Sequence, residues 1–172
     1  MIQKVLEDAI NQQIAREMYS SNLYLSMAGS FHSINLNGFA NWMRVQAQEE
    51  MAHALKFFDY LLDRGGNVRI GEIAAPENIW KNPLDGFQAS YEHEQKVTQW
   101  INEIADLAVK EGDHATQVLL QWFITEQVEE EATVSDIVAR LRLAGDSSGS
   151  LFMLDNELKT RVFVPPPTKA GA

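Results

Sequence analysis

One face of residues 4–33 combines apolar side chains with a glutamate, and this combination limits the possible folds most strongly. At 100° per residue, the face consists of Leu6, Ile10, Ile14, Ser21, Tyr24, Leu25 and Ala28. Glu17 falls in the middle of this face. Burying an ionised carboxylate without a partner costs several kcal/mol. The segment therefore predicts a helix whose buried carboxylate must be balanced by a positive charge.

The same pattern recurs in three further segments, and the recurrence matters because a single glutamate on a helix is usually exposed. The polar residues on the apolar faces are Glu50 and His53 in residues 38–64, Glu94 in residues 83–111, and Glu126 and Glu130 in residues 114–143. The basic residues Arg16, Lys56, Lys96 and Arg140 fall off these faces. A bound metal ion can supply the missing charge. Oxygen ligands with one imidazole favour iron or manganese.

Turn and capping residues separate these four segments. They are Asn35 to Gly38, Gly65-Gly66, Asn82-Pro83, Gly112-Asp113 and Gly145. Each segment has close to 30 residues, or about 45 Å at 1.5 Å per residue. Four helices of matched length predict an all-α four-helix bundle. The long connection at 65–82 fits one crossover between two helical hairpins, and it includes the extended-looking stretch 68–70.

A shorter apolar segment follows the bundle and predicts a fifth helix at about 149–160. Because such a short helix is marginal alone, it needs a partner surface. We expect a single domain over residues 1–164 and a loose, proline-rich tail at 165–172.

Composition narrows the function. A length of 172 residues fits one domain, and the net charge of −10 argues against nucleic acid and anionic membranes as partners. The absence of cysteine excludes disulfides, thiolate zinc sites and iron–sulfur clusters. No secretory signal or apolar run of roughly 20 residues stands out. A cytoplasmic location is therefore expected.

The two hairpins show an internal repeat in their polar residues. Glu17 precedes Glu50 by 33 residues and His53 by 36. Glu94 precedes Gln127 and Glu130 by the same two intervals. The two halves are offset by 77 residues, so the three positions of one hairpin correspond to the three positions of the other. This symmetry predicts a two-metal site on a pseudo-twofold axis.

These residues match a known arrangement, in which two lone glutamates and two Glu-x-x-His motifs form the di-iron site of ferritin-like bundles. Glu17, Glu94 and the Glu50-x-x-His53 motif are present, and residues 48–54 form the most specific local signature. Gln127-x-x-Glu130 replaces the second motif. Over nearly its full length the chain resembles the bacterial non-haem ferritins, which are poor in histidine at that position.

The resemblance implies a set of iron ligands. Glu17, Glu50 and His53 would hold one iron, and Glu50 would bridge to a second. The residues implied for the rest of the site are Glu94 and Glu130 as ligands of the second iron, Gln127 as a hydrogen-bonding neighbour, Tyr24 as a tyrosine beside the pair, and Glu49, Glu126, Glu129 and Glu130 around a third iron. Tyr24 could equally be plain core packing, and Glu49 and Glu129 lie at the edges of their apolar faces.

The resemblance also implies a function. The family oxidises Fe(II) to Fe(III), with O₂ or H₂O₂ as oxidant, and stores a ferric oxyhydroxide mineral in a shell of 24 subunits. The fifth helix would lie near the four-fold axes of this homo-oligomer. Channels near the three-fold axes would place Asp113 or His114 at the pore.

Four alternatives remain open. A haem-binding bacterioferritin would use Met51 as a haem ligand, but the missing second Glu-x-x-His motif argues against it, and no haem is expected. A DNA-protecting mini-ferritin would lack the fifth helix, and this chain has no basic tail. A di-iron oxygenase usually keeps both histidines. A scaffold bundle would take up no metal, but it leaves the carboxylates on the apolar faces unexplained.

Overall fold

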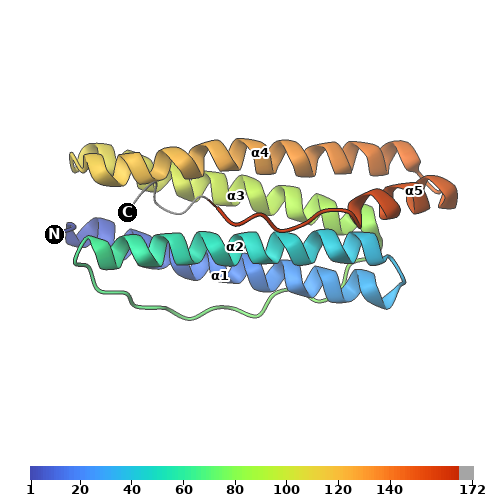
Figure 1. Ribbon diagram of the computed structural model, residues 1–172, viewed down its shortest axis with the longest axis horizontal. Helices are drawn as coiled ribbons and strands as arrows, with labels where there is room; N and C mark the ends of the chain where they lie inside the picture. Colours follow the sequence, from blue (N-terminus) through green and yellow to red (C-terminus); the bar gives the residue numbers. More distant parts are fainter. Residues whose placement is uncertain (167–172) are drawn as a thin grey trace.

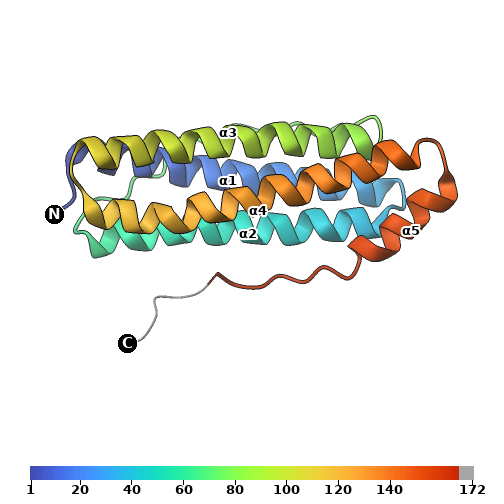
Figure 2. The ribbon, with the colours of Figure 1, turned by 90° about the horizontal axis from the view of Figure 1, so that it is seen from above.

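The computed structural model describes residues 1–166, which form five α-helices and no strand. The helices are α1 (Lys4–Ser33), α2 (Asn37–Asp63), α3 (Pro83–Lys110), α4 (His114–Ala144) and α5 (Ser148–Leu158). The first four lie side by side as a bundle, and α5 sits at one end of it (Figures 1 and 2). The all-α bundle with a crossover and a short fifth helix is confirmed. Most of the tail predicted at 165–172 lies outside the described residues.

Local chemistry sets the helix boundaries. The side chain of Asn82 accepts a hydrogen bond from the backbone N–H of Asp85 at the start of α3, with proline at the next position. Asp113 caps α4 in the same way, through the backbone N–H of Thr116. Four residues with positive φ follow helix ends: Asn35, Gly65, Gly112 and Gly145.

The crossover between α2 and α3 runs along the outside of α1 (Figure 1). The stretch 68–70, expected to look extended, forms no strand among the described residues. Asn11 holds it instead, because its amide donates to the carbonyl of Asn67 at 2.9 Å and accepts from the N–H of Arg69 at 2.6 Å. A side chain of α1 therefore satisfies backbone groups that a sheet would otherwise pair.

The apolar core consists of two clusters that flank a polar middle layer. One cluster contains α1 from Leu23 onward and α2 as far as Ala47, together with Phe87 and Val134. The other contains the opposite ends of the same helices, including Ile14, Phe57, Val97 and Phe123. On all four helices the interval between the clusters holds the carboxylates expected to be buried. Leu25 was wrongly assigned to the core, since its side chain is 52% exposed.

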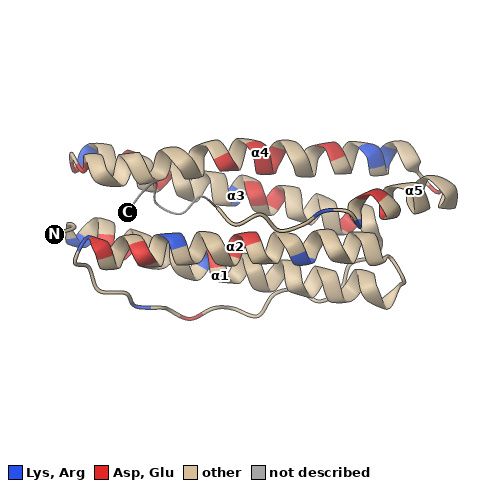
Figure 3. Cartoon of the chain, in the orientation of Figure 1, with Lys and Arg blue, Asp and Glu red and all other residues tan. Residues whose placement is uncertain are grey.

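Charged side chains divide between the surface and this middle layer. Figure 3 shows acidic positions of α2, α3 and α4 near mid-length of the bundle. Within residues 1–166, no helix is both long and apolar enough to span a membrane.

Helix α5 packs against the start of α2 through a very close backbone contact. The Asp155 carboxylate accepts hydrogen bonds from the N–H groups of Gly38, at 2.7 Å, and Phe39, at 3.1 Å. These N–H groups have no partner within α2, so a residue of α5 caps α2. A Cβ added at Gly38 would lie 1.6 Å from the carbonyl oxygen of Asp155. Only glycine fits there.

We predict that Gly38→Ala lowers the free energy of unfolding by about 1–3 kcal/mol, as overpacking typically does. The added methyl must push α5 off α2. Gly29→Ala is the matched control, because nothing lies within 4 Å of its added Cβ, and it should be neutral or slightly stabilising. Denaturant unfolding of both variants measures the difference. Equal stabilities would contradict this account of the α2–α5 contact.

Candidate metal centre

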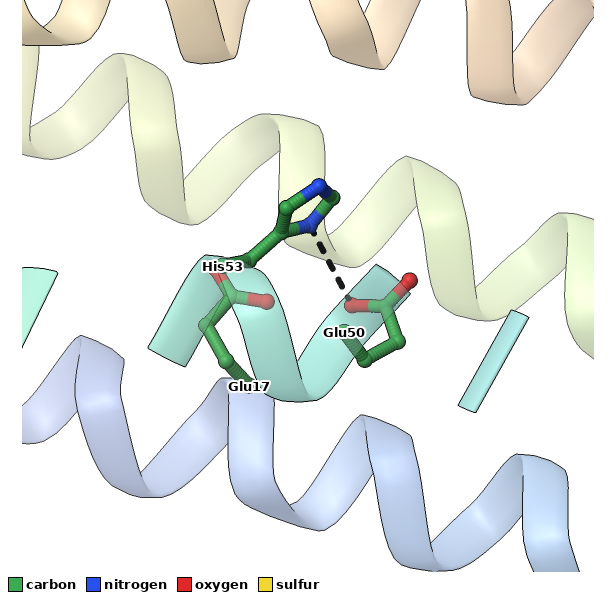
Figure 4. Close-up of side chains that lie close together, drawn as sticks. All are labelled: Glu17, Glu50 and His53. Atoms are coloured by element: carbon green, nitrogen blue, oxygen red, sulfur yellow. Dashed lines mark ion pairs between the residues drawn. The ribbon is translucent and has the colours of Figure 1, made fainter. Parts of the chain in front are cut away.

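Three side chains from two helices meet in the polar middle layer. Glu17 of α1 points toward Glu50 and His53 of α2 (Figure 4). One ligand atom of each lies within 4.8 Å of the others, and all three residues are buried. The His53 Nδ1 lies 3.7 Å from a Glu50 oxygen. The structure thus brings together the residues predicted for the first metal.

The second hairpin supplies a matching group. Glu94 is fully buried, and Glu130 is 6% exposed. The hydroxyl of Tyr24 donates a hydrogen bond to Glu94. The amide of Gln127 donates to the other Glu94 oxygen at 3.2 Å. Tyr24 is therefore more than core packing, since its hydroxyl contacts a predicted ligand.

Gln127 is buried but also borders a surface groove. It lines a groove of about 300 Å³ between α3 and α4, together with Thr98 and Glu131. Its amide lies 3.3 Å from the Thr98 hydroxyl and is hydrogen-bonded to Glu94. Gln127 therefore stands between this groove and the buried carboxylate.

Two further glutamines hold the carboxylates in place. Gln46 donates to Glu50 at 3.0 Å and to Glu130 at 2.7 Å, so one amide links predicted ligands from both hairpins. Gln13 donates to Glu17 at 2.8 Å. The sequence interpretation missed both glutamines. The available signal was spacing, because each precedes its carboxylate by four residues and so lies one helical turn away.

Burial and mutual repulsion shift the pKa values of the four buried glutamates of the cluster. Burial, reinforced by the charge of Glu50, raises the pKa of Glu17 well above its usual range and that of Glu94 to about 8. Burial and the charge of Glu94 raise the pKa of Glu130 in the same way. Burial also acts on Glu50, but the adjacent His53 and the hydrogen bond from Gln46 outweigh it and lower the pKa of Glu50. Without a cation, the raised pKa values of Glu17, Glu94 and Glu130 mean that burial disfavours the charged form of these carboxyls.

The donor set suits an oxygen-preferring metal ion. The partners of these carboxylates are amides, a phenol and an imidazole. In addition, Glu17 Oε2 is buried and has no hydrogen-bond partner within residues 1–166. A buried carboxylate oxygen without a partner is costly. A metal ion bound between Glu17, Glu50 and His53 would satisfy it.

The family assignment comes from similarity to known proteins. The family model described as "Ferritin-like domain" matches residues 7–144, which is most of the chain. The chain belongs to the ferritin family. A bacterial non-heme ferritin from Bacteroides fragilis is 44% identical over 94% of this chain and 100% of that protein. One from Escherichia coli O6:H1 is 40% identical over 93% of this chain and 97% of that protein.

Solved ferritin structures agree with the fold. The open pore ferritin from Archaeoglobus fulgidus is 49% identical, with a TM-score of 0.93 over 94% of this chain and 100% of that one. A closed form of that ferritin made by site-directed mutagenesis has a TM-score of 0.94 at the same identity and covers 95% of this chain.

Of the acidic residues predicted to hold a third iron in this ferritin, Glu126 joins Glu130 and His53 in a second group. The ligand atoms of these three residues lie within 4.8 Å of one another. Glu126 is half-buried rather than fully on the core side, Glu49 is half-buried, and Glu129 is exposed. The side of the bundle between α2 and α4 carries these residues, and the two hairpins contact each other mainly through α1 and α3.

One buried histidine of this ferritin was not predicted to belong to the site. His93 Nε2 lies 2.8 Å from the Ser20 hydroxyl, and its ring packs edge-on to Tyr24, with centroids 6.2 Å apart. Burial lowers the pKa of His93, although the charge of Glu50 opposes this. Its position beside Glu94 in the sequence was the only signal. The His93 ring therefore packs against the Tyr24 ring, whose hydroxyl donates to Glu94.

Proposed function

We propose that this ferritin oxidises Fe(II) to Fe(III) at a dinuclear carboxylate site within each subunit and stores the product as a ferric oxyhydroxide mineral. The observation that carries the proposal is the convergence of Glu17, Glu50, His53, Glu94 and Glu130 in one buried layer. All four long helices contribute, and two apolar clusters close the layer at either end. O₂ is the proposed oxidant, and H₂O₂ is the alternative.

Each residue has a role in this scheme. Glu17, Glu50 and His53 hold one Fe(II), and Glu94 and Glu130 hold the other, with Glu50 between them. Gln46, bonded to Glu50 and Glu130, fixes the spacing between the two halves. Because the pKa values of Glu17, Glu94 and Glu130 are raised, iron binding displaces protons from them. Carboxylates that reprotonate readily also suit a site that must release its product.

Tyr24 is proposed as a positioning residue for the second iron. We predict that Tyr24→Phe slows iron oxidation about ten-fold, because residues that orient metal ligands typically contribute factors of 10 to 100. The Glu94 carboxylate would lose one of its two side-chain donors. Stopped-flow absorbance measures the rate. Tyr19→Phe, which also removes a hydroxyl from a ring near His93, should leave it unchanged. Equal rates in both variants would contradict the role.

A third iron and a cage complete the proposal. Glu49, Glu126, Glu129 and Glu130 are the proposed ligands of the third iron, on the side of the pair toward α2 and α4. The assembly is proposed to be a hollow 24-subunit homo-oligomer in the cytoplasm. Phe152 and Met153 of α5 are 66% and 74% exposed and offer apolar contacts to neighbouring subunits. No haem, nucleic acid or membrane enters the scheme.

Aerobic titration of the metal-free protein with Fe(II) tests the proposal. Absorbance follows oxidation, and light scattering on the same sample gives the particle size. A fast phase that saturates near two irons per chain, in a particle of several hundred kilodaltons, would support it. Large particles without a fast phase would support the cage but contradict the dinuclear oxidation site. Small particles that do not react with iron would overturn both the storage and the oxidation roles.

A further inference from the structure

The residues that follow α5 return along the start of α2, as Figure 1 shows. The side-chain amide of Asn41 holds them there. It lies within hydrogen-bond distance of the carbonyls of Leu158 at 3.3 Å, Lys159 at 3.2 Å and Arg161 at 3.0 Å. We call residues 158–161, which are the last residue of α5 and the three that follow it, the C-terminal strap. One side chain of α2 thus fixes three carbonyls of the strap.

Arg161 makes the contact at the end of the strap. Its guanidinium stacks over the Trp42 ring, 4.2 Å from the centroid, and one nitrogen donates to the Trp42 carbonyl at 3.4 Å. Another nitrogen lies 2.5 Å from Glu49 Oε2. The two side chains of this ion pair are only 21% and 18% exposed. A stacked, partly buried arginine is held more firmly than a solvated surface pair.

Glu49 also lies close enough to the predicted metal ligands to interact with them electrostatically. It lies one helical turn before His53 on α2, and residues four apart share a helix face. His53 in turn has ligand atoms of Glu126 and Glu130 within 4.8 Å. Burial raises the pKa of Glu49, with further contributions from Glu50 and Glu126, while the charge of Arg161 opposes the shift. Glu49 therefore stands between the carboxylates and the strap.

We propose that Arg161 competes with iron for Glu49, so that the C-terminal strap sets the affinity of the third iron site. The inference rests on the proposed function, because Glu49 serves as an iron ligand there. The guanidinium occupies one carboxylate oxygen and repels any second cation that approaches. An iron ion at Glu49 must displace Arg161 or share the carboxylate with it. The third iron site consequently binds iron weakly and releases it readily.

Calorimetric titration of the assembled, metal-free protein with Zn²⁺, and anaerobically with Fe(II), tests the competition without any turnover. The parent should show two tight ions per chain and one weaker ion. Arg161→Gln should tighten the weaker class about ten-fold and leave the tight class unchanged. Arg69→Gln is the matched control, since Arg69 also pairs with a carboxylate, Glu7 at 3.2 Å. Glu7 lies ten residues before Glu17, about 15 Å along α1, and Arg69 does not contact the strap.

Two more variants separate competition from a change in folding. Asn41→Ala removes the amide that holds the strap carbonyls but leaves the side chains of Arg161 and Glu49 unaltered, and it should tighten the same class. In Glu49→Gln, the further change Arg161→Gln should have no effect, because the double-mutant cycle removes their interaction. An unchanged or weakened third class in Arg161→Gln would overturn the inference while the tight class remained. A parent titration that showed no tightly bound ions would instead overturn the dinuclear site, and the inference with it.

Discussion

Replacing Glu50 by glutamine is expected to slow Fe(II) oxidation by at least about 100-fold. Residues that merely orient metal ligands contribute factors of 10 to 100, and Glu50 is proposed to contact both irons. Glutamine keeps the size of the side chain but removes its charge. The buried layer should still close, because Gln46 and His53 remain beside it. Stopped-flow absorbance at two Fe(II) per chain gives the rate.

Assembly provides the internal control for this variant. Glu50→Gln should form particles of the parent's size by light scattering. Glu72→Gln removes an exposed carboxylate of the crossover and should match the parent in both rate and size. If Glu50→Gln assembled normally and oxidised iron at the parent's rate, the assignment of Glu50 as the shared ligand would be wrong.

The metal-free protein is expected to lose stability as the pH rises toward 8. An unfolded glutamate ionises near pH 4.5, whereas Glu94 in the folded chain has its pKa raised to about 8 by burial and by Glu50. Between these values the folded state retains a proton that the unfolded state has released. Each such carboxyl therefore costs about 1.4 kcal/mol per pH unit across this interval. From pH 4.5 to 8 the loss for Glu94 alone is on the order of 5 kcal/mol.

Other titrating groups determine the pH range in which this dependence of stability on pH should be measured. The lowered pKa of His93 makes stability rise with pH, but only up to the ordinary value of 6.5. The lowered pKa of Glu50 contributes stability that is lost only below pH 4.5. Between pH 6.5 and 8 the raised carboxyls act alone among these groups, and Glu94 contributes a loss of roughly 2 kcal/mol. Denaturant unfolding at the two pH values measures it.

Glu94→Gln and added metal separate the causes of the slope. The variant removes the titrating group, so its stability should fall less between pH 6.5 and 8. Zn²⁺ should stabilise the parent more at pH 8 than at 6.5, because binding must displace fewer protons there. A parent whose stability stayed level or rose over this range, or a variant with the same slope, would contradict the electrostatic description of the cluster.

Helix periodicity was sufficient to predict the bundle and the middle layer. Glu17 and Glu94 stood out because a charged residue on an apolar face conflicts with burial, and this conflict is visible without a structure. Capping residues such as Asn82 and Asp113 act on their immediate neighbours, so the helix starts were predictable too. The prediction that Leu25 is buried was wrong because this residue lies at the margin of its apolar face, where the packing of neighbouring helices decides exposure.

Contacts between distant segments were beyond the sequence pattern. Gln46 reaches Glu130 across 84 positions, and the pair depends on how the two hairpins dock. Arg161 reaches Glu49 only because α5 turns the chain back along α2. A lone arginine near a chain end carries no periodic signal. These contacts hold the proposed ligands in place, whereas the proposal of which residues are ligands follows from local spacing.

Crystals soaked anaerobically with Fe(II) and measured at the iron absorption edge test the dinuclear site most directly. The anomalous map should show two strong peaks within each subunit, one among Glu17, Glu50 and His53 and the other beside Glu94 and Glu130. A weaker third peak near Glu49 would agree with the proposed competition from Arg161. Iron found only on the outer surface, with the buried carboxylates unoccupied, would contradict the assignment of this layer as the iron-oxidising centre.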